Sequence, residues 1–220
     1  GGVGKTTCAS SAGLYLAKQG LKVLVISTDP AHSLSDSMGQ KFGAEIKEVK
    51  GINNLSVLEV NAQKALSQFK AGNEEQIKKI LNTSTYLDQQ DIDSLFTLPI
   101  PGIDELMGFK TIVDLIDKGG YDKYIVDTAP TGHALRLLTL PGLLDEWIKV
   151  MSKMRWKYRY MMETFSGKYK EDEGDDFLLM MKKMVKRIES LLKDQSRCEF
   201  IAVTIPEDMA ISETERLVSD

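Results

Sequence analysis

Cysteine is scarce in this chain, which has only Cys8 and Cys198 among 220 residues. Two cysteines so far apart do not make a disulfide scaffold, and their scarcity favours a reducing compartment, the cytoplasm. Long apolar runs are also lacking, since no stretch approaches the ~18 residues that a membrane-spanning helix needs. The formal net charge is −4, which excludes a strongly basic surface for nucleic acid. Hydrophobic residues at 42% and charged residues at 27% are typical of a globular protein.

The sequence begins without an initiator Met, and no signal peptide is expected from its first residues. It opens on a glycine-rich motif, Gly1-Gly-Val-Gly-Lys-Thr-Thr7. Residues Gly4, Lys5 and Thr6 match the last three positions of the phosphate-binding pattern G-x-x-x-x-G-K-[ST]. The first glycine of that pattern would fall two residues before Gly1, and the buried strand that precedes such a loop is missing too. We therefore expect a fragment that lacks at least its first strand.

The physical chemistry of this loop favours phosphate binding. Glycines let backbone amides turn toward phosphate oxygens, and the following helix, predicted over residues 5–19, directs its positive end at the same anion. Lys5 adds a charge near the β and γ phosphates, and the Thr6 hydroxyl is a ligand for Mg²⁺. A glycine-rich turn that only caps a helix is the structural alternative.

Apolar and β-branched runs predict strands that alternate with helical segments. Lys22–Thr28 is a near-continuous β-branched run, typical of a strand buried on both faces. Further strands are predicted over residues 55–60, 122–127 and 197–205, the first of them a candidate edge strand. Helical segments are predicted over residues 62–118, 142–195 and 212–220. This alternation predicts an α/β fold with a mostly parallel sheet flanked by helices.

Two of the predicted strands end in an acidic residue, Asp29 after the first and Asp127 after the strand over 122–127. In parallel α/β sheets, ligands bind at the carboxyl ends of the strands. Acidic residues at the edge that carries the phosphate-binding loop predict metal-assisted phosphoryl transfer. Taken alone, either aspartate is also open to interpretation as a helix N-cap.

Four segments of the chain form a specific combination, namely Gly1–Thr7, Ser27–Asp36, Pro101–Glu105 and Asp127–Arg136. Together with Ile205–Leu217, they resemble the arsenite-pump ATPase family, which includes the cytosolic ATPases that target tail-anchored membrane proteins. The resemblance spans the whole chain. It implies a P-loop NTPase of the deviant Walker A type, with a mostly parallel sheet and an inserted Met-rich helical subdomain.

The resemblance implies a role for each matching position. The ATP phosphates would be held by Gly1, Gly2, Val3, Gly4, Lys5, Thr6 and Thr7, and Glu207 would also contact the nucleotide. Asp29 would be the catalytic residue that polarises the attacking water. Thr6 would bind Mg²⁺ directly, and Asp127 would do so through a water molecule. The switch segments would include Pro30, His32, Asp36, Pro130, Thr131, Gly132 and His133.

The resemblance also implies a homodimer with nucleotides at its interface. A lysine just before the paired glycines reaches across that interface in the family, and this sequence begins one residue too late to show it. Family members extend past position 220, where an adenine-contacting asparagine and often a Cys-x-x-Cys zinc site lie. We therefore interpret residues 1–220 as a single P-loop ATPase domain without its first strand and its C-terminal part. Residues 62–118 and 142–195 are the expected helical subdomain insertions.

Methionine is concentrated in one part of the chain, because 7 of the 10 methionines fall between residues 151 and 184. Flexible, polarizable methionines on one helical face suit a groove that accepts varied apolar helices. The candidate groove residues are Met151, Met154, Met161, Met162, Phe177, Met180, Met181 and Met184. Their spacing fits packing against the domain core as well as it fits a groove. The resemblance favours the groove, because the family's client-binding subdomain lies in this region.

These patterns together predict an ATP-hydrolysing, dimeric, cytosolic targeting factor. It would capture hydrophobic tail segments of membrane proteins and deliver them to a receptor at the membrane. The first alternative is the ATPase subunit of an arsenite or antimonite efflux pump, which would need clustered cysteines that this sequence does not contain. The second alternative is a nucleotide-gated scaffold that does not hydrolyse ATP. No nucleic acid partner is expected.

Overall fold

The computed structural model describes residues 2–29, 33–76, 78, 103–128 and 173–219, and isolated helical positions at 142, 145, 146, 148, 149, 152, 153, 156, 160 and 164. Several residues of the predicted site lie outside this part of the chain. They are Gly1, Pro30, His32, Pro130, Thr131, Gly132, His133, Met151, Met154, Met161 and Met162.

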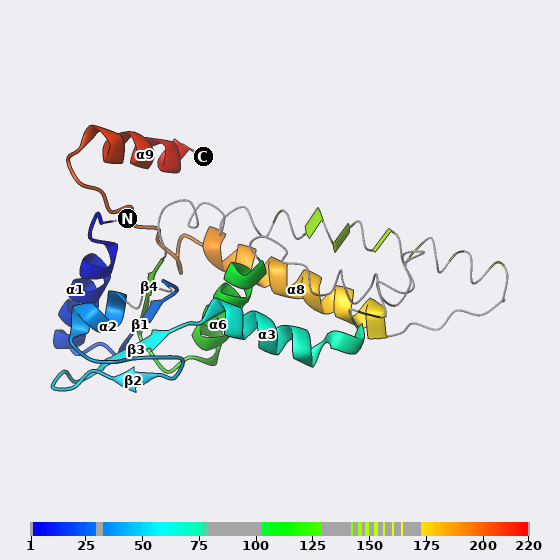
Figure 1. The fold of residues 1–220 in the computed structure, drawn as a ribbon, viewed down its shortest axis with the longest axis horizontal. Coiled ribbons are helices and arrows are strands. Elements are labelled where there is room, and N and C mark those ends of the chain that lie inside the picture. The colour runs from blue at the N-terminus through cyan, green and yellow to red at the C-terminus, as the bar shows by residue number, and fades with distance from the viewer. Residues whose placement is uncertain are drawn as a thin grey trace.

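A sheet with strand order β2-β3-β1-β4 forms the centre of the described structure (Figure 1). Its strands are β1 (Val23–Ser27), β2 (Lys47–Glu48), β3 (Leu55–Glu59) and β4 (Lys123–Asp127). Strand β1 pairs in parallel with both β3 and β4, and only the short β2 is antiparallel to its neighbour. The prediction of a mostly parallel sheet is therefore confirmed.

Three of the four predicted strands are confirmed as β1, β3 and β4. Strand β3 is an interior strand, because β2 pairs with its outer side, so its interpretation as an edge strand is wrong. The predicted strand over residues 197–205 is also wrong, since residues 198–205 form no strand, and Phe200 and Ile201 are exposed. A β-branched composition favours an extended chain, but a strand also needs a hydrogen-bonding neighbour. This segment has no pairing neighbour within the described part of the chain.

Six helices are described by their bounds. They are α1 (Lys5–Lys18), α2 (Ser33–Met38), α3 (Ala62–Gly72), α6 (Ile103–Lys118), α8 (Glu173–Lys193) and α9 (Asp208–Ser219). The prediction of a helix over residues 5–19 is confirmed, and the last helix begins earlier than predicted. Helix α2 was not predicted. No helix of the described residues is both long and apolar enough to span a bilayer.

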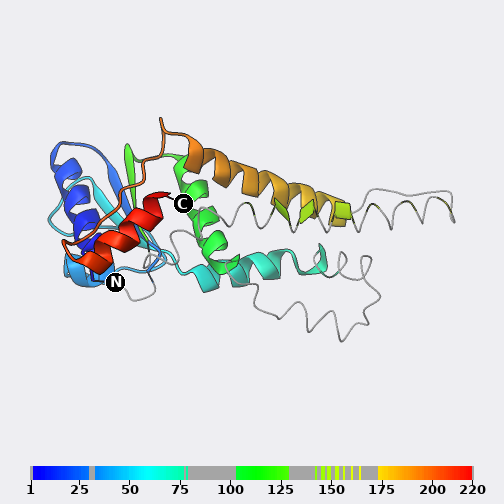
Figure 2. The ribbon, with the colours of Figure 1, turned by 90° about the horizontal axis from the view of Figure 1, so that it is seen from above.

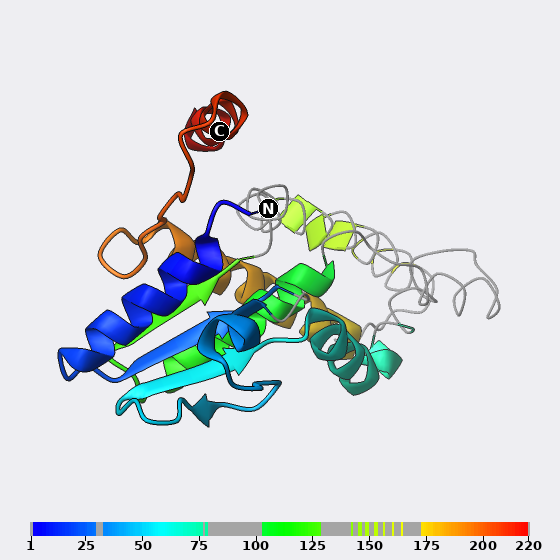
Figure 3. The ribbon, with the colours of Figure 1, turned by 60° about the vertical axis from the view of Figure 1, so that its left-hand side comes forward.

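The two faces of the sheet pack against different helices, because side chains alternate along each strand. Val23, Val25 and Leu55 belong to a core cluster with Ala17 of α1 and Leu34 of α2. On the opposite face, residues of β1 and β3 pack against α6 and α8, and this cluster contains Leu24, Ile26, Leu58, Ile112 and Ile188. Figure 3 shows α1 on one side of the sheet and α6 with α8 on the other. The described fold is thus a three-layer α/β arrangement.

Helix α1 approaches the sheet closely at Gly13. A Cβ atom at this position would lie 2.6 Å from the Val25 Cγ2 atom and 3.3 Å from the Leu55 Cδ1 atom. Only a residue without a side chain fits at such a separation, so Gly13 sets the distance between α1 and the strands. The start of α1, which follows the phosphate-binding loop, is therefore fixed against the sheet.

Helices α3, α6 and α8 pack together, and α3 and α8 extend in the same direction away from the sheet (Figures 1 and 2). The rings of Phe69 on α3 and Phe177 on α8 lie 6.1 Å apart. Between α6 and α8, the Arg187 guanidinium forms ion pairs with Asp114 and Asp117. These helices fall within the predicted insertions over 62–118 and 142–195, whose status as a subdomain remains a prediction.

Candidate nucleotide-binding site

The carboxyl edge of the sheet carries a row of polar side chains. Ser27 ends β1, and its register partners are Glu59 at the end of β3 and Asp127 at the end of β4. All three are buried, with relative exposures of 0%, 4% and 2%. Registered residues of parallel strands point to the same face, here the face that α1 and α2 cover. Two carboxylates and a hydroxyl therefore lie on the face of the sheet that α1 and α2 cover.

The loop before α1 has the backbone geometry of an anion site. Gly2 and Gly4 adopt φ angles of 89° and 91°, a region that residues with a side chain rarely occupy. Gly4 is the N-cap of α1 and provides no side-chain cap, and the first turn of the helix contains no acidic residue. The amides of that turn have no intrahelical acceptor, so they are oriented to bind an anion.

Asp127 connects this loop to the edge of the sheet. Its carboxylate is hydrogen-bonded to the Thr6 side chain and lies close enough to Lys5 and Asp29 to be influenced by their charges. Burial raises the pKa of Asp127, and the negative charge of Asp29 raises it further, whereas Thr6 and Lys5 act in the opposite direction. Among the described residues, the Asp127 Oδ2 atom has no hydrogen-bond partner.

A buried carboxylate oxygen of this kind is suited to a hard cation. Mg²⁺ prefers oxygen ligands, often through retained water molecules, and a hydroxyl with a carboxylate beside it is such a donor set. The Thr6 hydroxyl and the Asp127 carboxylate therefore fit the predicted magnesium site. Within the described ranges, no group of three or more His, Cys, Asp or Glu side chains is placed to hold a different metal, such as zinc.

Asp29 lies just beyond β1 and is held by two serines. Its backbone amide donates to the Ser27 Oγ atom at 3.1 Å. Its carboxylate oxygen Oδ2 accepts a hydrogen bond from the Ser33 hydroxyl at 2.8 Å. Ser33 is the first residue of α2, so the conformation of Asp29 depends on where this short helix begins.

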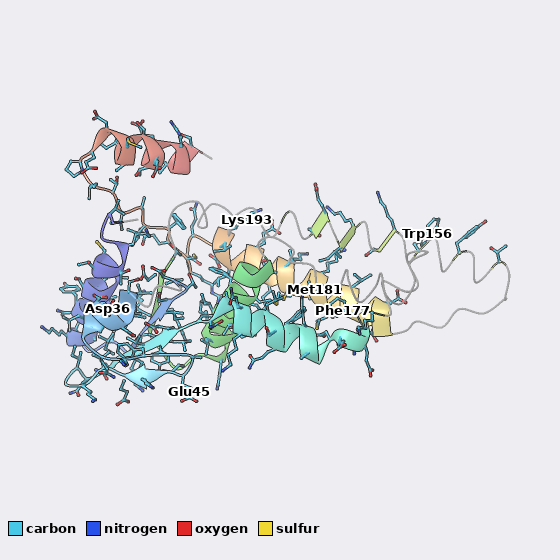
Figure 4. The ribbon with its side chains drawn as sticks, in the orientation of Figure 1. Asp36, Glu45, Trp156, Phe177, Met181 and Lys193 are labelled. Atoms are coloured by element: carbon cyan, nitrogen blue, oxygen red, sulfur yellow. The ribbon has the colours of Figure 1, made fainter. Side chains whose placement is uncertain are left out.

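The structure brings some of the predicted site residues together and leaves others apart. Lys5, Thr6, Asp29 and Asp127 form one cluster at the carboxyl edge. Asp36 is exposed on α2 (Figure 4), and Thr7 is exposed on α1. Glu207 is exposed just before α9, which stands apart from the sheet in Figures 1 and 3, so it does not join the cluster here.

One buried acidic residue at this edge, Glu59, was missed by the sequence analysis. Its Oε1 atom accepts hydrogen bonds from the amide and the hydroxyl of Ser35, at 3.1 Å and 2.8 Å. The available signal was the same one that identified Asp29 and Asp127, an acidic residue at the carboxyl end of an apolar strand. The strand over 55–60 contains this residue one position before its predicted end.

The candidate groove residues on α8 divide between its two sides. Phe177, Met181 and Met184 are buried in the core cluster with α6, and Figure 4 shows Phe177 and Met181 where α8 meets its neighbours. Met180 is 39% exposed, and Leu179 beside it is 50% exposed. Three of these four residues therefore pack in the core, as the alternative interpretation of their spacing predicted.

A cavity of about 270 Å³ lies on the other side of α8. It is lined by Ile148, Ser152, Trp156, Asp175, Leu178, Leu179 and Lys182. The Trp156 ring is 67% exposed and stacks on Tyr160 with a centroid separation of 6.0 Å. An exposed apolar surface therefore exists beside α8, on residues that differ from the predicted methionines.

The parallel sheet, the glycine loop leading into α1 and the carboxylate beneath it together define a P-loop nucleotide-binding domain. The family described as anion-transporting ATPase matches residues 1–220, the whole chain. The chain belongs to this family, and the resemblance seen in its motifs is confirmed.

Curated relatives support the same assignment over the full length of the chain. The sequence is 35% identical to ATPase ASNA1 homolog 1 of Paramecium tetraurelia, covering 100% of this chain and 68% of that protein. It is 36% identical to ATPase GET3 of Malassezia globosa, covering 100% of this chain and 65% of that protein. It is 37% identical to ATPase ASNA1 homolog of Entamoeba dispar, with coverages of 100% and 69%. The chain thus spans about two thirds of these relatives.

Proposed function

We propose that this chain is the ATPase domain of a dimeric, cytoplasmic targeting factor for tail-anchored membrane proteins. ATP hydrolysis would drive a cycle in which the protein captures an apolar tail segment and releases it to a receptor at the membrane. The observation that supports the ATPase part most directly is Asp127, a buried carboxylate beside Thr6 and Lys5 with an unpartnered oxygen among the described residues.

The residues at the carboxyl edge have different roles in the proposed phosphoryl transfer. Amides of the loop at Gly2–Gly4 and the first turn of α1 bind the phosphates, and Lys5 balances charge on the outermost one. Thr6 and Asp127 would hold Mg²⁺, which would supply positive charge to neutralise the phosphate oxygens. Asp29 orients the attacking water through its carboxylate, whose conformation is fixed by Ser33.

The substitution Asp29→Asn tests this assignment in the full-length protein. We expect nucleotide affinity to stay the same, because the loop and Lys5 are unaltered, while the rate of hydrolysis falls about 10²-fold or more. Nucleotide binding and phosphate release would be measured on the same preparation. Glu45→Gln is the control, since Glu45 is exposed near β2 (Figure 4). Hydrolysis by Asp29→Asn at the wild-type rate would contradict the role of Asp29.

The client-binding part of the proposal rests on the names of the relatives and on the apolar surface beside α8. The relatives named GET3 and ASNA1 ATPases cover the whole chain. Trp156 and Leu179 line the cavity and are exposed, and Met180, the next residue of α8, is exposed as well. Apolar burial would supply the free energy of capture. Of the other candidate groove residues, Phe177, Met181 and Met184 are buried in the core. Met151, Met154, Met161 and Met162 lie outside the described part of the chain.

Charged substitutions at exposed positions test client capture without disrupting the packing of the hydrophobic core. Leu179→Asp and Met180→Asp are expected to lower the capture of an apolar tail peptide while nucleotide binding persists. Met181→Asp is unsuitable because Met181 is 2% exposed, and a carboxylate there would unfold the helical layer. Undiminished capture by the double variant Leu179→Asp and Met180→Asp would assign the client to another surface.

The second candidate function is metalloid export, which the family description "anion-transporting ATPase" favours. The two cysteines give little support to this function, because Cys8 lies on α1 whereas Cys198 lies in the segment after α8, and burial raises the pKa of the Cys198 thiol. Soft metalloids bind thiolates, and a raised pKa disfavours the thiolate form. Stimulation of the ATPase by arsenite or antimonite would support this function, and absence of any hydrolysis would instead support a nucleotide-gated scaffold.

A further inference from the structure

We propose that Glu59 is a positioning residue for ATP hydrolysis, because its carboxylate anchors α2 and α2 in turn fixes Asp29. This inference rests on the proposed function, in which Asp29 orients the attacking water. It assigns a role to a buried acidic residue of the carboxyl edge that the proposed mechanism does not use.

Glu59 is placed by regular sheet geometry. It lies opposite Ser27 in the parallel register of β1 and β3, and its amide donates to the Gly43 carbonyl at 3.0 Å. The side chain is 4% exposed, on the face of the sheet covered by α1 and α2. A buried carboxylate is costly unless it accepts good hydrogen bonds, so its partners define what it does.

Two of its hydrogen bonds come from the first turn of α2. The Glu59 Oε1 atom accepts from the Ser35 amide at 3.1 Å and from the Ser35 hydroxyl at 2.8 Å. The amide of Ser35 has no acceptor within its own helix, because the first amides of any helix lack one. A carboxylate in this position forms charge-assisted bonds and also favours the positive end of the helix. Glu59 therefore caps α2 from a different element of the fold.

The same turn of α2 holds Asp29. Ser33, two residues before Ser35, donates its hydroxyl proton to the Asp29 Oδ2 atom at 2.8 Å. The other support of Asp29 is the bond from its amide to Ser27, the residue that neighbours Glu59 across the sheet. A shift of α2 relative to β3 would therefore move the donor that orients the Asp29 carboxylate.

Two further bonds tie α2 to its surroundings. The Ser37 hydroxyl donates to the Ser10 Oγ atom of α1 at 3.0 Å, and the Phe42 amide donates to the Ser35 Oγ atom at 3.0 Å. Three serines of α2 thus contact three elements: the end of β1, the end of β3, and the helix that follows the phosphate-binding loop. The contact to Glu59 joins α2 to a buried carboxylate through two hydrogen bonds.

Removing this anchor should affect hydrolysis more than binding. Glu59 is not among the residues proposed to bind the phosphates or Mg²⁺, so nucleotide affinity should persist. Asp29 would lose the fixed position of its donor, and a misplacement of about 1 Å near the reacting atoms lowers a rate by about 10²-fold. Glutamine at position 59 retains an amide oxygen that accepts both bonds from Ser35.

The test compares Glu59→Ala, Glu59→Gln and Ser35→Ala with the wild type in the full-length protein. The steady-state kcat and KM for Mg-ATP and the Kd of a fluorescent ATP analogue would be measured. We expect Glu59→Ala to lower kcat by about tenfold to 10²-fold with KM and Kd nearly unchanged, and Glu59→Gln to restore most of the rate. Glu48→Ala is the matched control, because Glu48 is an exposed glutamate on β2 and should behave like the wild type.

Each outcome decides the inference. Wild-type kcat in Glu59→Ala, or KM and Kd that change as much as kcat, would overturn it, and so would failure of Glu59→Gln to restore the rate. Should Glu59→Ala not fold, Ser35→Ala decides, since it removes the 2.8 Å bond to Glu59 together with the bond from the Phe42 amide, and it must lower kcat at constant KM. If the wild-type protein has no ATPase activity, the proposed function itself is overturned. If the wild type and Glu59→Ala are equally active, only the inference about Glu59 is overturned.

Discussion

At the scale of single residues, Asp127 shows how stability and function oppose each other at one position. Burial places its carboxylate among β strands and beneath α1, where the charged form is disfavoured. The same burial keeps an oxygen available for a cation beside Thr6. Strained or destabilised groups of this kind are common in active sites, where surrounding structure holds them in place.

Asp127→Asn should therefore stabilise the metal-free protein near neutral pH. The pKa of Asp127 is raised in the folded state, so the folded protein binds this proton more tightly than the unfolded chain. Stability from this group is present below the unfolded pKa of about 3.8 and is lost as pH rises through the folded pKa. We expect a higher Tm for the asparagine variant at pH 7 with a chelator present, and a smaller difference in acid.

Thermal unfolding of both proteins across this pH range would measure the effect. Glu45→Gln is the control, because its carboxylate is exposed and its removal should leave Tm unchanged. A lower Tm for Asp127→Asn at pH 7 would contradict the burial argument. The same variant should lose magnesium-dependent hydrolysis, which separates its gain in stability from its loss of function.

Gly13→Ala is expected to destabilise the fold by about 1–3 kcal/mol. The added methyl would lie 2.6 Å from the Val25 Cγ2 atom, so α1 or the strand must move. Gly72→Ala is the control, because it is also a helical glycine and a Cβ there meets nothing within 4 Å. Chemical denaturation would compare the two variants. A neutral Gly13→Ala would show that α1 is not held at this distance.

The sequence predicted the residues whose chemistry is local and missed those whose role depends on pairing. The glycine loop and the strand-end aspartates were identified because each pattern is contained within a few residues. Glu59 carries the same signal, but its significance depends on Ser35, which lies 24 residues away in the chain. Residues 197–205 have the composition of a strand, yet composition does not supply the neighbour that a strand needs.

At the scale of elements, α8 illustrates how one helix face is committed to the core. Phe177, Met181, Met184 and Ile188 recur at helical spacing and are all buried against α6 and its neighbours. The apolar spacing predicted this face, but it did not distinguish a core from a groove, because both require the same stripe. Arg187, 45% exposed, adds ion pairs to Asp114 and Asp117 that contribute at most about 1 kcal/mol each.

Adjacent methionines on α8 should therefore respond differently to truncation. Met181→Ala is expected to lower the free energy of unfolding by about 2–5 kcal/mol, because it leaves a cavity in the core. Met180→Ala, at a residue that is 39% exposed, should change it by less than about 0.5 kcal/mol. Equilibrium denaturation of the two variants checks this difference, and equal effects would show that both sides of α8 are covered.

At the scale of the whole molecule, nucleotide binding should raise the stability of the folded state. A ligand that binds only the folded protein adds about 2.7 kcal/mol at a concentration of 100 times its Kd. The full-length protein should thus show a Tm that increases with Mg-ATP concentration. Lys5→Ala should abolish most of the increase, because the loop would lose its positive charge. An identical increase in the variant would indicate a nucleotide site elsewhere.

Strand β1 contributes neighbouring residues to opposite layers, Ile26 to the side of α6 and α8 and Ser27 to the side of α1 and α2. The hydrophobic cores on the two sides therefore share one backbone, so loss of β1 would disrupt both of them. Amide protons of β1 should exchange with deuterium only when the entire sheet opens. A displacement of Ser27, at the end of β1 beside the phosphate-binding loop, would therefore also displace Ile26 and the helices α6 and α8 that pack against it.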